Sequence, residues 1–457
     1  MRSPGAMSST QTKRSDGFPD DFLWGCSTSS YQIEGAFDVD GRGLSIWDAF
    51  CREPGRVNKG ENGDVACDSY RRWPQDVSLM TELGVDAYRF STAWPRIQPD
   101  GRGTPKSAGI DYYSRLVDGL LAAGIEPWLT LYHWDLPLAL GQAGGWINRE
   151  TALRFADYAA IMYRALGDRV QHWVTLNEPW CSAFLGYESG EHAPGIRDRA
   201  AALRATHHLL LAHGLAVEAF RQEAVPGEIG LVINPATPRP ATRRQADRDA
   251  AARASVERTG LWLDPLFGRG YPAAYLAARD AEMPALPGDM DLIAAPVDFI
   301  GVNYYNEDAV VATAATEANP DGYRFVQTSL PKTEMGWDIV PNGLRRVLNF
   351  IQDSWPVKAL YVTENGAAFA DGADGAGRVH DRLRIEYFRE HIFACKEAIQ
   401  DGVPLRGYFA WSLLDNFEWS HGYDKTFGLV AVDPRTLERR PKDSFYWYRD
   451  AITGCGV

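Results

Sequence analysis

The sequence predicts an α/β protein that consists of a single (β/α)8 TIM barrel with long insertions in its βα loops. Short runs rich in β-branched and aromatic residues alternate with longer segments in which apolar residues recur at spacings of three and four. Eight such runs occur, which is the number of parallel strands that closes this kind of barrel. Glycine follows several of the helical segments, as expected where a helix ends in left-handed backbone before the next strand.

Strands and helices are expected in alternation along the chain. The eight strands are predicted at residues 22–27, 87–92, 126–131, 170–176, 228–233, 297–302, 360–363 and 405–411. Helices long enough for a crossover are predicted at residues 111–123, 149–166, 200–220 and 381–400, and Gly84, Gly124 and Gly402 mark helix ends. Residues 234–298 and 304–337 are expected to be insertions. Residues 238–258 are either a linker or a solvated helix, and we favour the helix.

The composition is that of a folded globular protein with one large core. The chain has 457 residues, of which 45% are hydrophobic and 23% are charged. We expect a disordered N-terminal tail over residues 1–17 and a single barrel domain over residues 18–457. The 47 basic and 60 acidic side chains give a net charge of −13, which repels phosphate backbones and argues against nucleic acid as a partner.

The six cysteines are scattered, with no C-x-x-C pair and no histidine at zinc-finger spacing. We therefore expect no metal and no other cofactor, and the dispersed thiols fit a reducing compartment, so a cytoplasmic location is predicted. The N-terminus lacks the apolar run of a secretory signal, and no segment approaches the 18 or so apolar residues needed to span a bilayer. Association with a membrane is not expected.

Polar and aromatic residues collect in the predicted strands or directly after them. Because the carboxyl ends of all eight strands meet at one face of such a barrel, these side chains are expected to converge there, where barrel enzymes carry their active sites. The residues in question are Gln32, Arg89, His133, Trp134, Asn177, Glu178, Asn303, Tyr305, Glu364, Trp411, Glu418 and Trp419.

Two of these residues are glutamates on nearly opposite sides of the barrel mouth, Glu178 after the fourth strand and Glu364 after the seventh. A single glutamate in such a place is often only a helix cap. Two facing carboxyls, each beside an asparagine, suit glycoside hydrolysis, because one can hold a proton for the leaving oxygen while the other stays ionised.

Six motifs in order strongly resemble glycoside hydrolase family 1, the β-glucosidases. They are YQIEG at 31–35, WPR at 94–96, HWD at 133–135, TLNEP at 175–179, TENG at 363–366 and WSLLDNFEW at 411–419. The resemblance runs from about Phe18 to about Tyr448. It implies a retaining exo-β-glycosidase that hydrolyses terminal β-D-glucosyl residues of cellobiose and of aryl or alkyl glucosides. Side activity on galactosides or fucosides, and transglycosylation, are compatible with it.

The resemblance also implies roles for individual residues. Glu178 is the expected acid/base and Glu364 the expected nucleophile, with Arg89 as the cation beside Glu364 and Tyr305 as its hydrogen-bond donor. The small-molecule substrate is expected to contact Gln32, His133, Trp134, Asn177, Asn303, Trp337, Trp411, Glu418, Trp419 and Phe427. Trp337 belongs to the aglycone side of this set. Cys181 is expected to border the aglycone site and to influence leaving-group preference.

Other functions remain open at this point. A 6-phospho-β-glucosidase is disfavoured, because that branch of the family usually carries a serine and a lysine for the phosphate where this chain has Glu418 and Trp419. A non-catalytic sugar-binding barrel typically lacks one of the two glutamates, and a thioglucosidase has glutamine at the position of Glu178. The natural aglycone and the choice between a monomer and a homo-oligomer are left undetermined.

Overall fold

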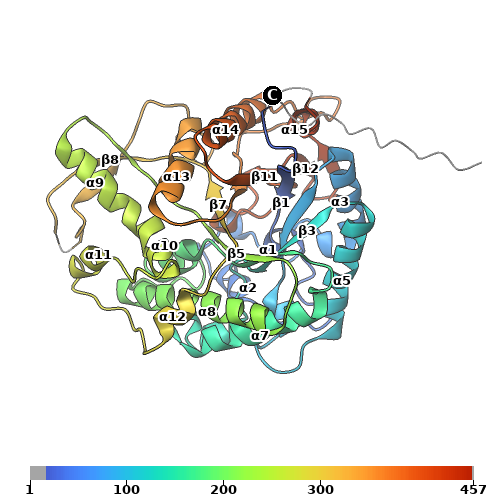
Figure 1. Cartoon of the computed structure of the whole chain (residues 1–457). Coiled ribbons are helices and arrows are strands. Elements are labelled where there is room, and N and C mark those ends of the chain that lie inside the picture. Colours follow the sequence, from blue (N-terminus) through green and yellow to red (C-terminus); the bar gives the residue numbers. More distant parts are fainter. Residues whose placement is uncertain (1–16, 317, 455–457) are drawn as a thin grey trace, which may run out of the picture.

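The computed structural model describes residues 17–316 and 318–454, and its central feature is a closed barrel of eight parallel strands (Figure 1). Around the barrel the strands follow the order β1-β11-β10-β7-β5-β4-β3-β2. They are β1 (Leu23–Ser27), β2 (Ala87–Ser91), β3 (Glu126–Tyr132), β4 (His172–Asn177), β5 (Glu228–Ile233), β7 (Phe299–Tyr304), β10 (Leu360–Asn365) and β11 (Leu405–Trp411). All eight predicted strands are present in the predicted order, so the (β/α)8 prediction is confirmed.

Long helices surround the barrel, and shorter ones lie in the loops. The long helices are α3 (Ser69–Leu83), α5 (Ser107–Ala122), α7 (Glu150–Leu166), α8 (Arg199–Gln222), α13 (Pro341–Ser354), α14 (Arg382–Gln400) and α15 (Asp443–Ile452). The shorter α-helices are α1 (Ser30–Ile33), α2 (Ile46–Phe50), α4 (Trp94–Ile97), α6 (Leu138–Gln142), α10 (Leu261–Leu266), α11 (Ala273–Ala277) and α12 (Asp289–Ile293). Helical turns of other types are η1 (Asn58–Gly60), η2 (Gly145–Ile147), η3 (Cys181–Leu185), η4 (Val256–Gly260) and η5 (Trp419–His421).

The two predicted insertions contain structure of their own. A small sheet with strand order β6-β8-β9 is built from β6 (Arg239–Pro240), β8 (Ala309–Ala312) and β9 (Tyr323–Val326). Helix α9 (Gln245–Ser255) packs beside it, at the edge of the molecule in Figure 1. The helix favoured for residues 238–258 is therefore present, although it is shorter than that range. A second small sheet pairs β12 (Val430–Val432) with β13 (Arg439–Pro441).

Element boundaries differ from the prediction mainly at strand ends. Strand β10 continues to Asn365, two residues beyond the predicted end, so Glu364 lies within the strand rather than after it. The extension is possible because the buried Asn365 side chain is fully bonded: its amide nitrogen donates to the Tyr304 carbonyl and its oxygen accepts from the Tyr408 hydroxyl.

Glycines 84, 124 and 402 have φ of +77°, +75° and +99°, as predicted for helix ends.

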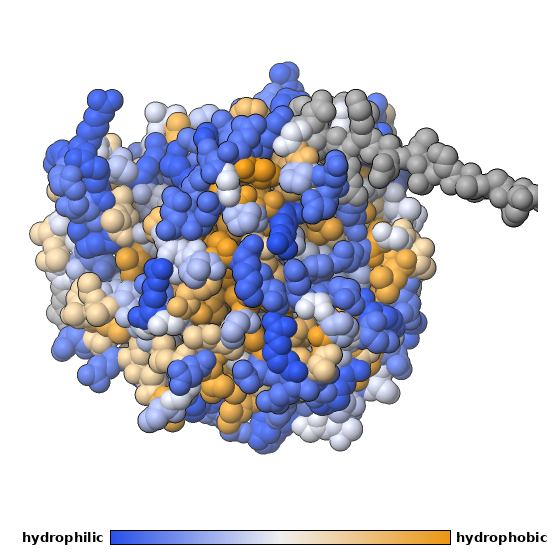
Figure 2. All heavy atoms as spheres, in the orientation of Figure 1, coloured by the Kyte–Doolittle hydropathy of each residue, from blue (hydrophilic) through white to orange (hydrophobic). Residues whose placement is uncertain are grey.

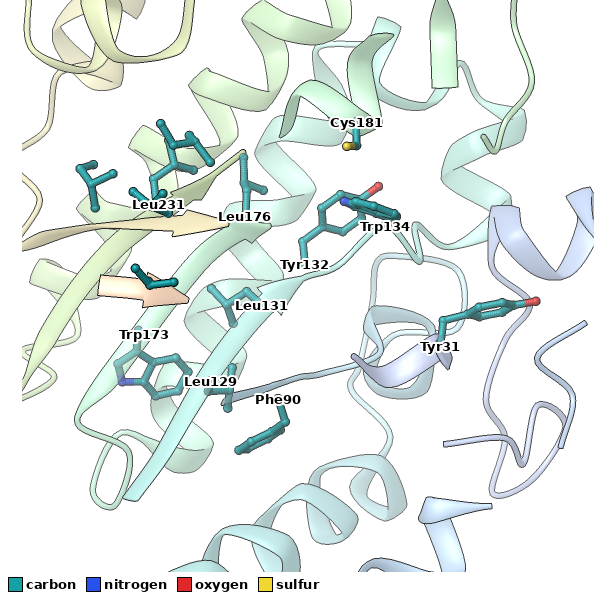
Figure 3. Packing of buried hydrophobic residues seen from close by; sticks show 14 of the residues in the cluster. Tyr31, Phe90, Leu129, Leu131, Tyr132, Trp134, Trp173, Leu176, Cys181 and Leu231 are labelled. Atoms are coloured by element: carbon teal, nitrogen blue, oxygen red, sulfur yellow. The ribbon is translucent and has the colours of Figure 1, made fainter. Parts of the chain in front are cut away.

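The barrel interior is packed with side chains, and the same strands turn their alternate residues toward the helices. Ala87, Trp128, Val174, Phe299 and Phe409 form one buried cluster inside. Figure 3 shows part of the outer layer, which includes Leu129, Leu131, Trp173, Leu176 and Leu231. Because this interior is filled, a ligand can reach only the end of the barrel, where the inward-facing residues become polar.

The face of the molecule in Figure 2 is covered mostly by hydrophilic residues, with apolar residues visible in patches between them. Among the described residues, no helix is both long and apolar enough to cross a membrane. The tail predicted for residues 1–17 lies outside the described residues, apart from the exposed Gly17.

Candidate active site

A pocket of about 430 Å³ opens at the carboxyl end of the barrel, a size that suits a small-molecule ligand. Most of the residues predicted to form the site line it. These are His133, Trp134, Asn177, Glu178, Asn303, Tyr305, Trp337, Glu364, Trp411, Glu418, Trp419 and Phe427. Arg89 and Gln32 lie behind this wall and act on it through hydrogen bonds.

Glu364 is held by one cation and one phenol. A nitrogen of the buried Arg89 guanidinium lies 2.5 Å from Oε1 of Glu364, and the hydroxyl of Tyr305 donates to Oε2 at 2.5 Å. Burial and the charge of Glu364 raise the pKa of Tyr305 well above its ordinary value, so the phenol stays protonated and keeps donating. Both oxygens of Glu364 are therefore bonded by groups that favour the ionised carboxylate.

A chain of amides connects Glu364 with Glu178. The second terminal nitrogen of Arg89 donates to Oδ1 of Asn177 at 2.6 Å. The amide nitrogen of Asn303 donates to that same oxygen at 3.1 Å and to Oε1 of Glu178 at 2.6 Å. The Thr363 hydroxyl donates to the Asn303 oxygen at 2.8 Å, which fixes the orientation of the amide. The relative position of the two carboxyls thus rests on four strands, β2, β4, β7 and β10.

Glu178 has only neutral donors in contact with its carboxyl. Asn303 donates to one oxygen, and the thiol of Cys181 donates to the other at 3.0 Å. The backbone of Glu178 is left-handed, with φ of +44°, a conformation that costs energy for a residue with a side chain and that recurs at functional sites. This turn points the carboxyl into the pocket directly after β4.

Burial raises the pKa of both carboxyls. For Glu364, contact with Arg89 opposes this effect and the nearby negative charge of Glu178 adds to it. Since the two groups interact, the protons belong to the pair, and one proton is retained above the usual carboxyl range. A guanidinium in direct contact stabilises a carboxylate more than neutral donors do, so we place the negative charge on Glu364 and the proton on Glu178.

The tautomer of His133 follows from its neighbour. Because the oxygen of Asn177 accepts from Arg89, its amide nitrogen faces Nε2 of His133 at 3.1 Å, and Nε2 must accept. Burial, with a smaller effect of Arg89, holds the pKa of His133 well below its usual range, so the ring is neutral and its proton is on Nδ1. Within the described residues Nδ1 is buried without a hydrogen-bond partner, which leaves it free to donate to a ligand.

An aromatic and acidic wall lines another part of the same pocket. Trp411 and Trp419 both lie nearly parallel to the His133 ring, with centroids 5.9 Å away in each case. Gln32 donates to the Phe417 carbonyl at 2.9 Å and, more weakly, to Glu418 at 3.4 Å. Burial, and then the charges of Glu364 and Glu178, raise the pKa of Glu418 to about 8. This wall offers flat apolar rings next to hydrogen-bonding groups, a combination that suits a sugar ring.

Known proteins of similar sequence and structure fit this geometry. Residues 14–457 match the sequence model of glycosyl hydrolase family 1. The chain belongs to glycosyl hydrolase family 1. It is 47% identical to β-glucosidase A of Thermotoga maritima over 96% of this chain and 98% of that protein. It is 46% identical to a bifunctional β-D-glucosidase/β-D-fucosidase of Bifidobacterium breve over 95% of this chain and 98% of that protein.

A solved structure agrees over the same length. The β-glucosidase of Thermotoga maritima in complex with glucoimidazole superimposes with a TM-score of 0.93 and 46% identity, covering 96% of this chain and all of that chain. Membership of the family and a glycosidase fold, both predicted from the motifs, are confirmed. In this family 1 protein, as in the prediction, Glu178 and Glu364 lie in the same pocket.

Several residues of the family 1 pocket were not predicted. Asn234 and Pro235 line it directly after β5, a strand after which no polar residue was predicted, so their position after a strand end was an available signal. Arg258 also lines the pocket, with its guanidinium carbon 4.3 Å from the centre of the Trp180 ring. It comes from η4, deep in an insertion, where no strand rhythm points to the site.

Proposed function

We propose that the protein is a retaining exo-β-glucosidase that removes terminal β-D-glucosyl residues by double displacement. One observation carries the proposal: two buried carboxyls share a pocket at the barrel mouth, and only Glu364 is in direct contact with a cation. This asymmetry supports Glu364 as the nucleophile and Glu178 as the acid/base.

In the first step Glu364 attacks the anomeric carbon, and the bond from that carbon to the glycosidic oxygen breaks. The proton of Glu178 passes to this oxygen, which leaves as an alcohol. The negative charge of Glu364 is consumed in the new ester. This loss of charge lowers the pKa of Glu178, because the repulsion between the two carboxylates disappears.

In the second step Glu178, now ionised, takes a proton from water while the water oxygen attacks the same carbon. The bond to Glu364 breaks, glucose leaves in the β configuration, and Glu178 is again protonated. When an alcohol or a second sugar replaces the water, the same step gives transglycosylation. Two inversions at one carbon give overall retention.

The deep end of the pocket supports a role in binding the terminal sugar. The Nδ1 proton of His133 and the Glu418 carboxyl can bond hydroxyl groups, with Gln32 holding Glu418 from behind. Asn177 is assigned to the 2-hydroxyl. Trp411, Trp419 and Trp134 supply apolar ring surfaces. Trp134 can offer only its ring face, because its indole nitrogen is already bonded to the Asn177 carbonyl at 2.9 Å. Activity on β-fucosides as a side reaction fits the bifunctional relative named above.

The aglycone end is lined by a second group of aromatic side chains. Trp337, Phe427 and the ring of Tyr305 pack together with centroids 5.5 to 6.3 Å apart. We assign this cluster to the aglycone of cellobiose and of aryl or alkyl glucosides. Asn303 contributes by fixing Glu178 as well as by lining the wall.

The test is hydrolysis of a panel of p-nitrophenyl β-glycosides and their 6-phosphates, with the released anomer followed by NMR at early times. We expect rapid release of β-glucose from the unphosphorylated glucoside. Release of α-glucose first would contradict retention, and a preference for the 6-phosphates would contradict the proposed substrate. If the folded protein hydrolyses none of these substrates, a non-catalytic sugar-binding barrel would be favoured.

The nucleophile is tested by Glu364→Ala. We expect this variant to lose nearly all turnover and to regain it with azide, forming the α-glucosyl azide, because azide can enter the space of the carboxylate and attack once. Wild type under the same conditions is the control, because it keeps the Glu364 carboxylate and gains nothing from azide. Full turnover of Glu364→Ala without any added nucleophile would remove Glu364 from the role.

We further propose that residues 18–457 act as one catalytic domain in the cytoplasm. The free thiols of Cys26, Cys51, Cys67, Cys181 and Cys395 are all buried, which fits a reducing compartment.

A further inference from the structure

Cys181 contacts the carboxyl that the proposed mechanism uses as acid and base. Its sulfur lies 3.0 Å from Oε2 of Glu178, while the other oxygen of Glu178 is bonded by Asn303 at 2.6 Å. The amide nitrogen of Asn234 donates to the same sulfur at 3.3 Å. A sulfur that accepts from Asn234 directs its own proton elsewhere, and Glu178 is the acceptor in reach.

The local backbone brings the thiol to this position. Cys181 begins η3, a π-helical turn, and π-turns in proteins are often found at functional sites. Its backbone nitrogen donates to the Glu178 carbonyl at 2.9 Å, so the two side chains leave the same turn. Figure 3 shows Cys181 on this turn beyond the ends of β3 and β4, near Tyr132 and Trp134, with which it lines a small cavity.

The thiol remains a donor throughout the working range. Burial and the neighbouring negative charge of Glu178 raise the pKa of Cys181 well above its ordinary value, so the sulfur stays protonated. A thiol is a weaker donor than a hydroxyl. Cysteine at this position therefore restrains the carboxyl without stabilising its ionised form as strongly as serine would.

We propose that Cys181 is a positioning residue that orients the Glu178 carboxyl and, by being a weak donor, keeps it protonated to a higher pH than a hydroxyl would. The inference rests on the proposed function. In the first step Glu178 must be protonated, and in the second it must be ionised. The strength of the one donor on Oε2 therefore sets the upper pH limit at which a poor leaving group can still be expelled.

Other charged or titratable groups also act on Glu178. They are Arg89 from β2, Arg258 from η4, Tyr305 after β7, Glu364 from β10 and Glu418 after β11. All of them are unchanged when only position 181 is varied. A series of variants at this position thus isolates the effect of the thiol.

The experiment measures kcat/KM against pH for C181A, C181S and wild type with two substrates. With cellobiose, whose leaving group needs a proton, the alkaline limit of C181A is expected to move up and that of C181S to move down, each by about half a unit to one unit. With 2,4-dinitrophenyl β-glucoside, whose leaving group needs no proton, kcat/KM is expected to stay within about twofold of wild type. Ser182→Ala, on the same turn but without contact to Glu178, is the matched control and should leave both limits in place.

The proposal would be overturned if wild type, C181A and C181S had the same alkaline limit of kcat/KM. It would also be overturned if the variants lost kcat/KM equally with both substrates, because an equal loss indicates only a loosened turn. The order C181A above wild type above C181S would support it. If C181A is poorly folded, the alkaline limits of C181S and wild type with cellobiose are sufficient to test the proposal, since serine is close in size to cysteine. Wild type that releases no β-glucose from either substrate would instead contradict the proposed function.

Discussion

Arg89 bonds Glu364 with one nitrogen and Asn177 with the other, so a single side chain fixes both the charge of one carboxyl and the position of the Asn177 amide. The planar guanidinium makes this possible, because its donors lie in a fixed fork that a lysine could not reproduce. The same amide then sets the tautomer of His133. The buried guanidinium of Arg89 thus fixes the charge of Glu364 and the orientation of Asn177, and through Asn177 it also fixes the tautomer of His133.

A first prediction concerns the phenol on the other oxygen of Glu364. Tyr305→Phe removes a donor that lowers the pKa of Glu364, so this pKa should rise. The acidic limit of kcat/KM is expected to move to higher pH by about one unit, from the energy of one hydrogen bond to a charged group. Tyr304→Phe is the control, because the Tyr304 hydroxyl donates to the Val340 carbonyl instead. An unmoved acidic limit in Tyr305→Phe would show that the phenol does not act on Glu364.

At this scale the sequence predicts residue types better than contacts. Glu178, Glu364, Arg89 and Tyr305 could be named because each lies in or directly after a predicted strand and the resemblance to the family implies a role for it. The hydrogen bond from Cys181 could not, because it depends on the left-handed backbone of Glu178 and the π-turn that follows. Neither conformation has a reliable signal in residue order.

Among the elements, the loop from β11 to β12 carries Glu418 and Trp419 and is anchored by buried ions. The Lys442 ammonium bonds Asp371 at 2.7 Å and Asp415 at 2.9 Å. Asp415 in turn accepts from the Gly428 backbone at 2.8 Å, which ties the two ends of the loop together. Arg384 neutralises Asp371 from the other side. The part of the pocket wall that carries Glu418 and Trp419 thus depends on buried ion pairs next to it.

Lys442→Met tests this anchor. The variant leaves Asp415 buried without a cation in contact, and the free energy of unfolding is expected to fall by about 3 kcal/mol. Because the loop is loosened near Glu418, KM should rise more than kcat falls. Urea denaturation and steady-state kinetics measure the two effects. Adding Asp415→Asn to the same variant should recover part of the stability, whereas a loss below about 0.5 kcal/mol in the single variant would mean that the pair is not an anchor.

In the whole molecule, the regular part of the fold could be predicted and the irregular part could not. A barrel strand is buried on both faces and reads as a continuous apolar run, so all eight strands were found. Strands β6, β8 and β9 have two to four residues each, too short for a clear periodic signal, and β6 is paired only with β8, which lies far from it in sequence. Arg258 enters the pocket from the same irregular region, which explains why it was missed.

The assembled site also affects the stability of the whole protein. Burial next to two other carboxyls raises the pKa of Glu418 to about 8, whereas in the unfolded chain a glutamate titrates near about 4.3. Between these values the folded state binds more protons than the unfolded state, so this group's contribution to stability decreases as the pH rises through that window. The slope approaches about 1.4 kcal/mol per pH unit where the folded protein is protonated and the unfolded chain is not.

Glu418→Gln removes this titration while keeping a group of the same shape beside Gln32. We expect the variant to gain stability relative to wild type steadily from pH 5 to pH 8, as measured by urea denaturation at each pH. From the proposed role of this carboxyl in binding the sugar, we also expect it to lose activity. Glu282→Gln, which replaces an exposed glutamate, is the matched control for the loss of one carboxyl. A constant difference for Glu418→Gln would mean that Glu418 is ionised in the folded protein across this range.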